Sequence, residues 1–164
     1  MRPLAAFALL ALAACGDGGQ APAAPVLSPD GLAPYRIGMP LAGLDAKPPT
    51  NADPAGCFYV QTPAAPALTF MIQDGVVQRI EARDPSVALE HGLHLGDPAE
   101  KVHAAYGDKV DVQPHKYDYE AGSQYLTIFT PDKQRAIRYV TAAGKISAAY
   151  AGNAEAVQLV EGCG

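Results

Sequence analysis

The chain has 164 residues, enough for one domain and a leader segment, with 49% hydrophobic and 18% charged residues. Its 12 Lys and Arg against 17 Asp and Glu give a formal net charge of −5. This acidic balance argues against a nucleic-acid-binding protein, because phosphate backbones are bound by clustered basic residues. After the leader no apolar run reaches 18 residues, so the sequence predicts no membrane-spanning helix downstream of it.

The first fifteen residues have the pattern of an export signal. Arg2 precedes an apolar run over residues 4–11, too short to cross a bilayer as a stable helix. Leu12-Ala13-Ala14-Cys15 follows and resembles the lipobox of bacterial lipoproteins. The resemblance implies that a signal peptide, residues 1–14, is removed and that Cys15 is acylated on its thiol and its new amine. The alternative is an ordinary export signal that ends near a cysteine.

The acyl chains implied by this resemblance would anchor the protein durably, since each buried CH₂ contributes about 0.8 kcal/mol. In enterobacterial lipoproteins an Asp directly after the cysteine tends to retain the protein in the inner membrane. Asp17 stands one place later, so we expect the periplasm-facing outer membrane. The lipidated cysteine and the Pro- and Gly-rich stretch after it, residues 15–34, lack periodicity and predict a flexible tether. The folded domain is then expected over residues 35–164.

This domain contains an internal similarity. Gly38-Met39-Pro40 matches Gly96-Asp97-Pro98 at an offset of 58 residues, and each is followed by a short helical pattern. In the second copy Asp97 and Glu100 predict a capping box, and Gly107 predicts the end of the helix. The first helix is weaker because it contains Gly43.

Strands are expected after each helix. The alternation predicts them at residues 57–60, 68–72, 76–81, 136–141 and 145–150. A three-residue loop, Gln73-Asp74-Gly75, would place Phe70 opposite Gln78 and gather the apolar side chains on one face. Ala143-Gly144 predicts the second hairpin. Eleven additional residues in the second copy fit an extra strand pair, 115–119 and 124–129.

We therefore expect an α+β fold of two tandem units, about residues 35–87 and 88–164, each a short helix followed by an antiparallel meander. This arrangement resembles the SmpA/OmlA-like and β-lactamase-inhibitor-protein-like group. The resemblance covers roughly residues 35–150, and function does not transfer with such a fold. The last segment, residues 153–160, fits a helical turn or a strand.

Three cysteines are present, an odd number for an exported protein. If Cys15 carries lipid, Cys57 and Cys163 remain and should pair in an oxidising compartment. The alternative is two free buried thiols.

Catalytic motifs are missing from the sequence. No Gly-x-Ser-x-Gly, phosphate-binding loop or calcium loop is present. His91, His94 and His103 lie close in sequence, but Gly92 loosens the first pair, so we expect solvated histidines, no metal and no cofactor. A hydrolase with dispersed residues is the weakest hypothesis.

A tyrosine cluster is the most unusual polar feature. Tyr117 and Tyr119 would share one strand face, with Tyr125 across the turn. Such a face is either sheet core or an exposed binding surface. The sequence thus predicts a non-catalytic envelope lipoprotein that docks another envelope protein. The alternative is an inhibitor or small-ligand-binding protein of the periplasm.

Overall fold

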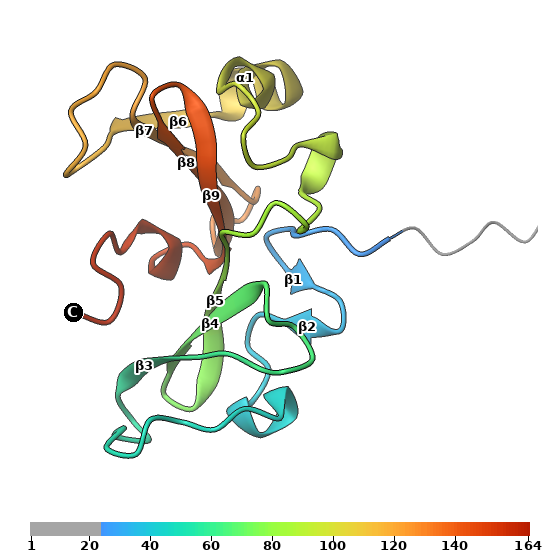
Figure 1. Ribbon diagram of the computed structural model, residues 1–164, viewed down its shortest axis with the longest axis vertical. Helices are drawn as coiled ribbons and strands as arrows, with labels where there is room; N and C mark the ends of the chain where they lie inside the picture. The colour runs from blue at the N-terminus through green and yellow to red at the C-terminus, as the bar shows by residue number, and fades with distance from the viewer. Residues whose placement is uncertain (1–23) are drawn as a thin grey trace, which may run out of the picture.

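The computed structural model describes residues 24–164, so Cys15 and the predicted signal peptide lie outside the described residues. Its centre is a seven-stranded antiparallel sheet in the order β3-β4-β5-β9-β8-β7-β6 (Figure 1). The strands are β3 Cys57–Val60, β4 Leu68–Gln73, β5 Val76–Ala82, β6 Asp111–Pro114, β7 Gln124–Phe129, β8 Arg135–Ala142 and β9 Lys145–Asn153. With one short α-helix, α1 Glu100–Tyr106, the predicted α+β class is confirmed.

The β4–β5 hairpin turns on two residues, not on the predicted three. Asp74 and Gly75 have φ of 52° and 73°, as a type I′ turn requires, and Gly is the residue that adopts this region without strain. A β-bulge at Gln78 then shifts the register, so that Phe70 lies opposite Ile80. The bulge turns Phe70 and Ile80 to the core. The predicted three-residue loop would also place these two side chains on one face. The Ala143-Gly144 turn of the β8–β9 hairpin is confirmed.

One face of the sheet packs on the apolar core, and the N-terminal segment closes part of it. Leu27 is fully buried, and its N–H donates to the carbonyl of Ala88 at 2.8 Å. The strands β1 Gly31–Leu32 and β2 Tyr35–Arg36 form a small separate sheet on this side (Figure 1). The predicted tether is therefore too long, because an apolar side chain inside it is buried in the core.

The segment before α1 pairs with the sheet. Gly96 N–H donates to the carbonyl of Ile146 at 2.8 Å, and the N–H of Ile146 donates to the carbonyl of Asp97 at 2.9 Å. The Asp97 carboxylate accepts the N–H of His94, so the predicted capping box does not form. Gly107 ends α1 as predicted.

The corresponding segment near residue 38 pairs in the same manner. Gly38 N–H donates to the carbonyl of Val77 at 2.8 Å, and the N–H of Val77 donates to the carbonyl of Met39 at 3.0 Å. It leads into a 3-10 helix, η1 Leu41–Leu44, rather than an α-helix. The other 3-10 helices are η2 Glu90–Gly92, η3 Gly107–Lys109 and η4 Ala156–Gln158.

The predicted strand over residues 115–119 is wrong, because β6 ends at Pro114. Residues 115–123 form a loop held by its own side chains. The Asp118 carboxylate accepts the Ser123 hydroxyl at 2.7 Å and the N–H of Glu120 at 3.0 Å. His115 Nδ1 accepts two backbone N–H groups. Such local bonds compete with strand pairing.

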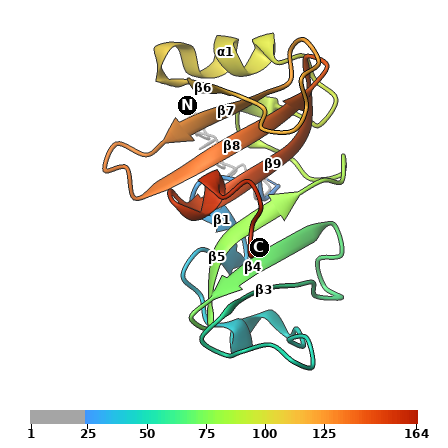
Figure 2. The same ribbon diagram turned by 90° about the vertical axis from the view of Figure 1, so that its left-hand side faces the viewer.

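After β9 the chain crosses the second face of the sheet as a C-terminal arm, residues 154–164, which contains η4. Figure 2 shows the arm in front of β9 and β5. Residues 153–160 were expected to form a helical turn or a strand, and the helical turn η4 is observed within them. Among residues 24–164, no helix has the length and apolar character needed to cross a membrane.

Candidate functional site

The face of the sheet opposite the core carries alternating tyrosines and arginines. Strand alternation brings Tyr59, Arg79, Tyr150, Arg138 and Tyr125 to this side, and we call these five the arginine–tyrosine ladder. The Arg79 guanidinium lies 4.8 Å from the ring centre of Tyr150 and 6.0 Å from that of Tyr59. The Arg138 guanidinium lies 4.8 Å from the Tyr125 ring centre. These distances are typical of cation–π interactions, which are stronger where water is excluded.

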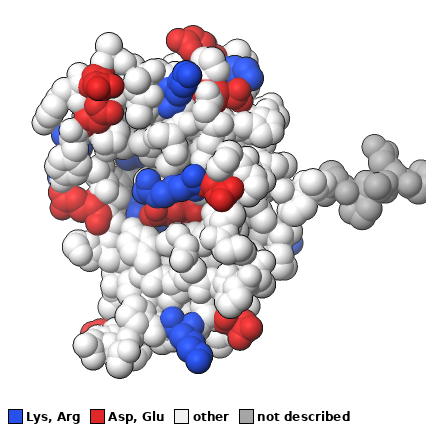
Figure 3. Space-filling view, viewed as in Figure 1, with Lys and Arg blue, Asp and Glu red and all other residues white. Residues whose placement is uncertain are grey.

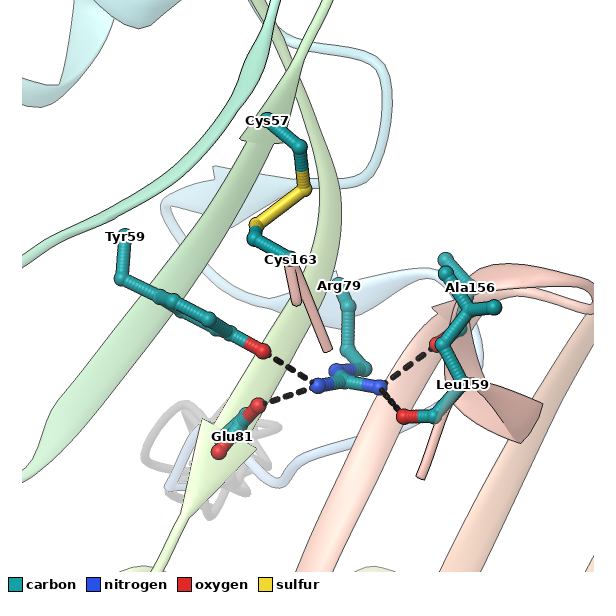
Figure 4. The surroundings of a disulfide bond; sticks show 7 residues. All are labelled: Cys57, Tyr59, Arg79, Glu81, Ala156, Leu159 and Cys163. Carbon is teal, nitrogen blue, oxygen red and sulfur yellow. Dashed lines mark hydrogen bonds and ion pairs between the residues drawn. A yellow bond between two sulfur atoms is a disulfide. The ribbon is translucent and has the colours of Figure 1, made fainter. Parts of the chain in front are cut away.

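Arg79 fastens the C-terminal arm to the sheet (Figure 4). Its Nη1 donates to the carbonyls of Ala156 and Leu159 at 2.6 and 2.8 Å. Its Nη2 donates to the Tyr59 hydroxyl at 2.5 Å and to Glu81 Oε1 at 2.6 Å. Arg79 is 2% exposed, and the Glu81 side chain is also buried. The guanidinium therefore neutralises a buried carboxylate and binds two carbonyls of η4, one at its first residue and one just after its last.

A disulfide between Cys57 and Cys163 joins the end of the arm to β3, which confirms the predicted pairing (Figure 4). The two Cα atoms are 5.2 Å apart, a usual separation for a disulfide. Beside it, Gly162 has φ of 64°, and a Cβ there would lie 2.0 Å from the Tyr59 hydroxyl oxygen. Glycine thus allows the arm to lie directly on the ladder.

Burial sets the protonation of the ladder. It raises the pKa of Tyr59 and Tyr150 above their usual value, so both remain neutral hydroxyls at neutral pH. It lowers the pKa of Arg138, but a guanidinium keeps its proton in proteins. Tyr59 and Tyr150 are therefore neutral rings beside a charged Arg138.

A pocket of about 230 Å³ lies at the Arg138 end of the ladder, between the sheet, the arm and the loop of residues 115–123. Its polar lining consists of Arg83, His115, Tyr117, Tyr125, Arg138, Ser147 and Tyr150. Its apolar lining consists of Val140, Val157, Leu159 and Val160. None of these side chains is acidic, although the protein as a whole is.

Arg138 differs from Arg79 in its partners. It is 1% exposed, its Nε donates to Thr127 Oγ1 at 2.9 Å, and its Nη2 donates to Gln113 Oε1 at 3.2 Å. Within residues 24–164 no carboxylate forms an ion pair with it, and Nη1 has no hydrogen-bond partner. Burying a charge without a counter-charge costs several kcal/mol. Arg138 is therefore a buried cation that lines a pocket and has no directly bonded carboxylate among the described residues, although Asp111 lies near enough to interact with its charge.

Arg83 covers the ladder from outside. Its side chain is 63% exposed, and its guanidinium lies 5.2 Å from the Tyr150 ring centre. It donates to the Tyr150 hydroxyl and, at 3.3 Å, to Glu81. Figure 3 shows basic and acidic atoms side by side across the middle of the molecule, with largely uncharged surface around them. Arg83 thus places a second, more exposed cation at the same pocket.

The predicted tyrosine face is wrong as a shared surface. Tyr119 is 90% exposed and Tyr117 is 58% exposed, both in the loop, while Tyr125 is buried under His115, whose ring stacks on it at 4.6 Å. Tyr117 and Tyr125 do meet, however, as two walls of the pocket. The Tyr117 hydroxyl bonds to Glu161 of the arm, which links the loop to the arm.

The three grouped histidines do not converge. The ring of His91 packs on Tyr106 at 4.6 Å, and His94 Nδ1 lies 3.9 Å from Asp97. Across the described part of the chain, no group of three or more His, Cys, Asp or Glu is placed to hold a metal ion.

Sequence reasoning missed the two buried arginines. Arg138 lies between Ile137 and Tyr139 in a strand whose six central residues are all buried. An arginine with apolar residues on both sides within a strand indicates burial on both faces, and this signal could have identified Arg138.

No protein-family model and no curated protein sequence matches the chain. One solved structure is similar at low level, an extracellular protein containing an SCP domain from Bacillus anthracis, with a TM-score of 0.47 and 10% identity. The match covers 73% of this chain and 44% of that protein.

Proposed function

We propose that this protein is a non-catalytic, lipid-anchored binding protein of the cell envelope, and that it binds a small ligand in the pocket between the sheet and the C-terminal arm. The observation that carries this proposal is Arg138, a buried cation without a carboxylate partner that lines a pocket without acidic residues. Binding fits better than catalysis. Ser147 donates its hydroxyl to the carbonyl of Val140, and His115 Nδ1 is occupied by backbone N–H groups, so no nucleophile and base are paired among the described lining residues.

Amide-resolved NMR of the full chain in detergent micelles tests the pocket. We expect a set of small anionic, neutral and cationic compounds to include some that shift the amide signals of His115, Leu159 and Val160. Shifts confined to other surfaces, or no shifts with any compound, would contradict the ligand-binding proposal.

The anchor is part of this proposal and rests on the sequence up to Cys15. Intact mass should show loss of residues 1–14 and the added mass of acyl chains, and membrane fractionation should place the protein in the outer membrane. Cys15→Ser should abolish the added mass and release the protein from the membrane. Retention of the unmodified mass in the wild-type chain would contradict the lipoprotein assignment.

A second candidate, docking of another envelope protein, is favoured by Tyr119. Its loop is held by the Asp118 contacts, yet the ring projects to solvent. Tyrosine is enriched among binding hot spots, and here an exposed tyrosine stands on a loop held by hydrogen bonds. Crosslinking in native membranes should then recover one partner with the wild-type protein and lose it with Tyr119→Ala, whereas Lys133→Ala on another exposed turn should retain it.

We also infer that the two halves of the domain are tandem copies of one unit. The support is the paired backbone bonding described above. Gly38 and Gly96 donate to equivalent carbonyls at the start of β5 and β9, and Leu41 and Ala99 donate to the turn glycines Gly75 and Gly144. In this interpretation the second unit supplies most of the pocket lining and the first unit supplies Arg83, and the arm is fastened to the first unit through β3 and β5.

A further inference from the structure

We propose that the ligand of the pocket is a small monocarboxylate with an apolar or aromatic body, whose anionic group binds between Arg138 and Arg83. This inference rests on the proposed ligand-binding function and specifies its chemistry. Its basis is the charge, the size and the wall composition of the pocket.

Charge selects an anion. Both cations that line the pocket are arginines, and the nearest carboxylate in the hydrogen-bond chain of Arg138 is Asp111, which is reached only through Gln113. The guanidinium nitrogen Nη1 keeps a free donor. A carboxylate there would supply the counter-charge that the fold omits, and charge-assisted bonds to Arg are among the strongest in proteins.

Size limits the ligand. A volume of about 230 Å³ is below the roughly 300–1,000 Å³ of pockets for drug-sized molecules. A nucleotide or an oligosaccharide does not fit such a space, whereas a single ring with a short acidic chain does.

The walls favour an apolar body. Val157, Leu159 and Val160 of the arm line the pocket together with Tyr125 and Tyr150 of the sheet. An inorganic anion would leave these surfaces in contact with water only. A ligand that carries both an acid and a ring would instead bury them, and apolar burial contributes about 25 cal/mol per Å².

Phenylacetate is the test ligand for a monocarboxylate with an aromatic body. Phenylacetamide is its neutral analogue of nearly the same shape, and inorganic phosphate is an anion that has no apolar part. Binding to the full chain in micelles, with its disulfide intact, is measured by calorimetry and amide shifts against a micelle blank. We expect phenylacetate to bind about tenfold more tightly than phenylacetamide, because one strong charge-assisted contact is added.

Substitutions test the contribution of each arginine to binding. Arg83→Gln changes an exposed side chain and should weaken phenylacetate binding by about threefold while leaving phenylacetamide unchanged. Arg138→Met should weaken it by tenfold or more. Arg135→Gln, which removes an arginine outside the pocket that pairs with Asp30, is the matched control and should change nothing.

The outcomes separate the two proposals. Equal binding of phenylacetate and phenylacetamide, or binding of phosphate alone, would overturn the monocarboxylate assignment and leave the pocket as a binding site. Phenylacetate binding that survives Arg83→Gln without change would also overturn it, whatever the folding of Arg138→Met. No pocket shift with any compound would overturn the ligand-binding function itself.

Discussion

The two ends of the arginine–tyrosine ladder use the same side chain for different purposes. Arg79 and Arg138 project from the same face of one sheet, and both are almost completely buried. Arg79 has a carboxylate, a hydroxyl and two carbonyls around it, and the arm is closed down on it. Arg138 has two neutral partners and a pocket. A buried arginine whose two terminal nitrogens both donate to protein acceptors is part of the framework, and one whose Nη1 has no acceptor within residues 24–164 is available to a ligand.

This difference also predicts how substitutions around each arginine alter the free energy of unfolding. The Arg79 half is cross-linked by a disulfide and a buried ion pair, so removing one partner leaves strained or unpaired groups. The Arg138 half has no such dependence, since no carboxylate there relies on the arginine. The following variants test that contrast, beginning with the largest expected effect.

Removing the disulfide should have the largest effect on stability. In the double variant Cys57→Ser and Cys163→Ser, the closed loop spanning 106 residues is lost. Chain entropy for a loop of this size predicts a loss of about 4–5 kcal/mol in the free energy of unfolding. Urea unfolding of the wild-type and variant chains measures this loss. A difference under about 1 kcal/mol would mean that Arg79 alone holds the arm.

Arg79→Met should follow, with a loss of about 3–4 kcal/mol, because it leaves the buried Glu81 carboxylate with only the longer 3.3 Å contact from the exposed Arg83. The same urea experiment measures it. The double variant Arg79→Met and Glu81→Leu should recover most of the loss, since it removes the orphaned charge as well. Equal destabilisation in the single and double variants would show that the arm carbonyls, not the ion pair, determine the role of Arg79.

Arg138→Met should change the free energy of unfolding by less than about 1 kcal/mol, because no carboxylate is left behind and an apolar side chain of similar length fills the site. Thermal and urea unfolding measure this. A loss as large as that of Arg79→Met would erase the contrast between the two arginines and identify Arg138 as part of the framework.

The smallest effect is expected at Glu161, which ties the loop to the arm through Lys116 at 2.6 Å and through Tyr117. The hydrogen bond from Lys116 lowers the pKa of Glu161 below its usual 4.5. A lowered pKa means that this contact stabilises the fold above pH 4.5 and is lost as pH falls further. Between pH 6 and 3, the loop amides should shift in the wild-type chain, and Glu161→Gln should remove that component. Identical profiles in the two chains would contradict it.

Local sequence signals predicted the parts of the fold that depend on local chemistry. Gly75 and Gly144 located both hairpins, although the loop predicted for the first was one residue too long, and Gly107 predicted the end of α1. The register of β4 on β5 could not be predicted because a bulge at Gln78 has no residue signature of its own. The burial of Leu27 was missed because its neighbours have the composition of a linker.

The candidate site was predictable only in part. Tyr117 and Tyr125 were identified from composition, but their different exposure depends on where β6 ends, which the side-chain bonds of His115 and Asp118 decide. In the sequence, Arg79 and Arg138 occupy strand positions that alternation would turn toward solvent. The apolar neighbours of Arg138 in β8 are a local signal of its burial. The contact of Arg79 with the arm joins segments far apart in the chain, and no local pattern encodes it.

The length of the disulfide loop has a consequence for how the correct bond is chosen. Cys57 is 106 positions from its partner, whereas Cys15 is only 57 − 15 = 42 positions away. Loop-closure entropy favours the shorter ring by about 0.8 kcal/mol, or about fourfold. A free Cys15 thiol would therefore be the better competitor for Cys57 in an unfolded chain. Attachment of lipid to that thiol, as proposed above, removes the competitor before oxidation and leaves Cys163 as the partner.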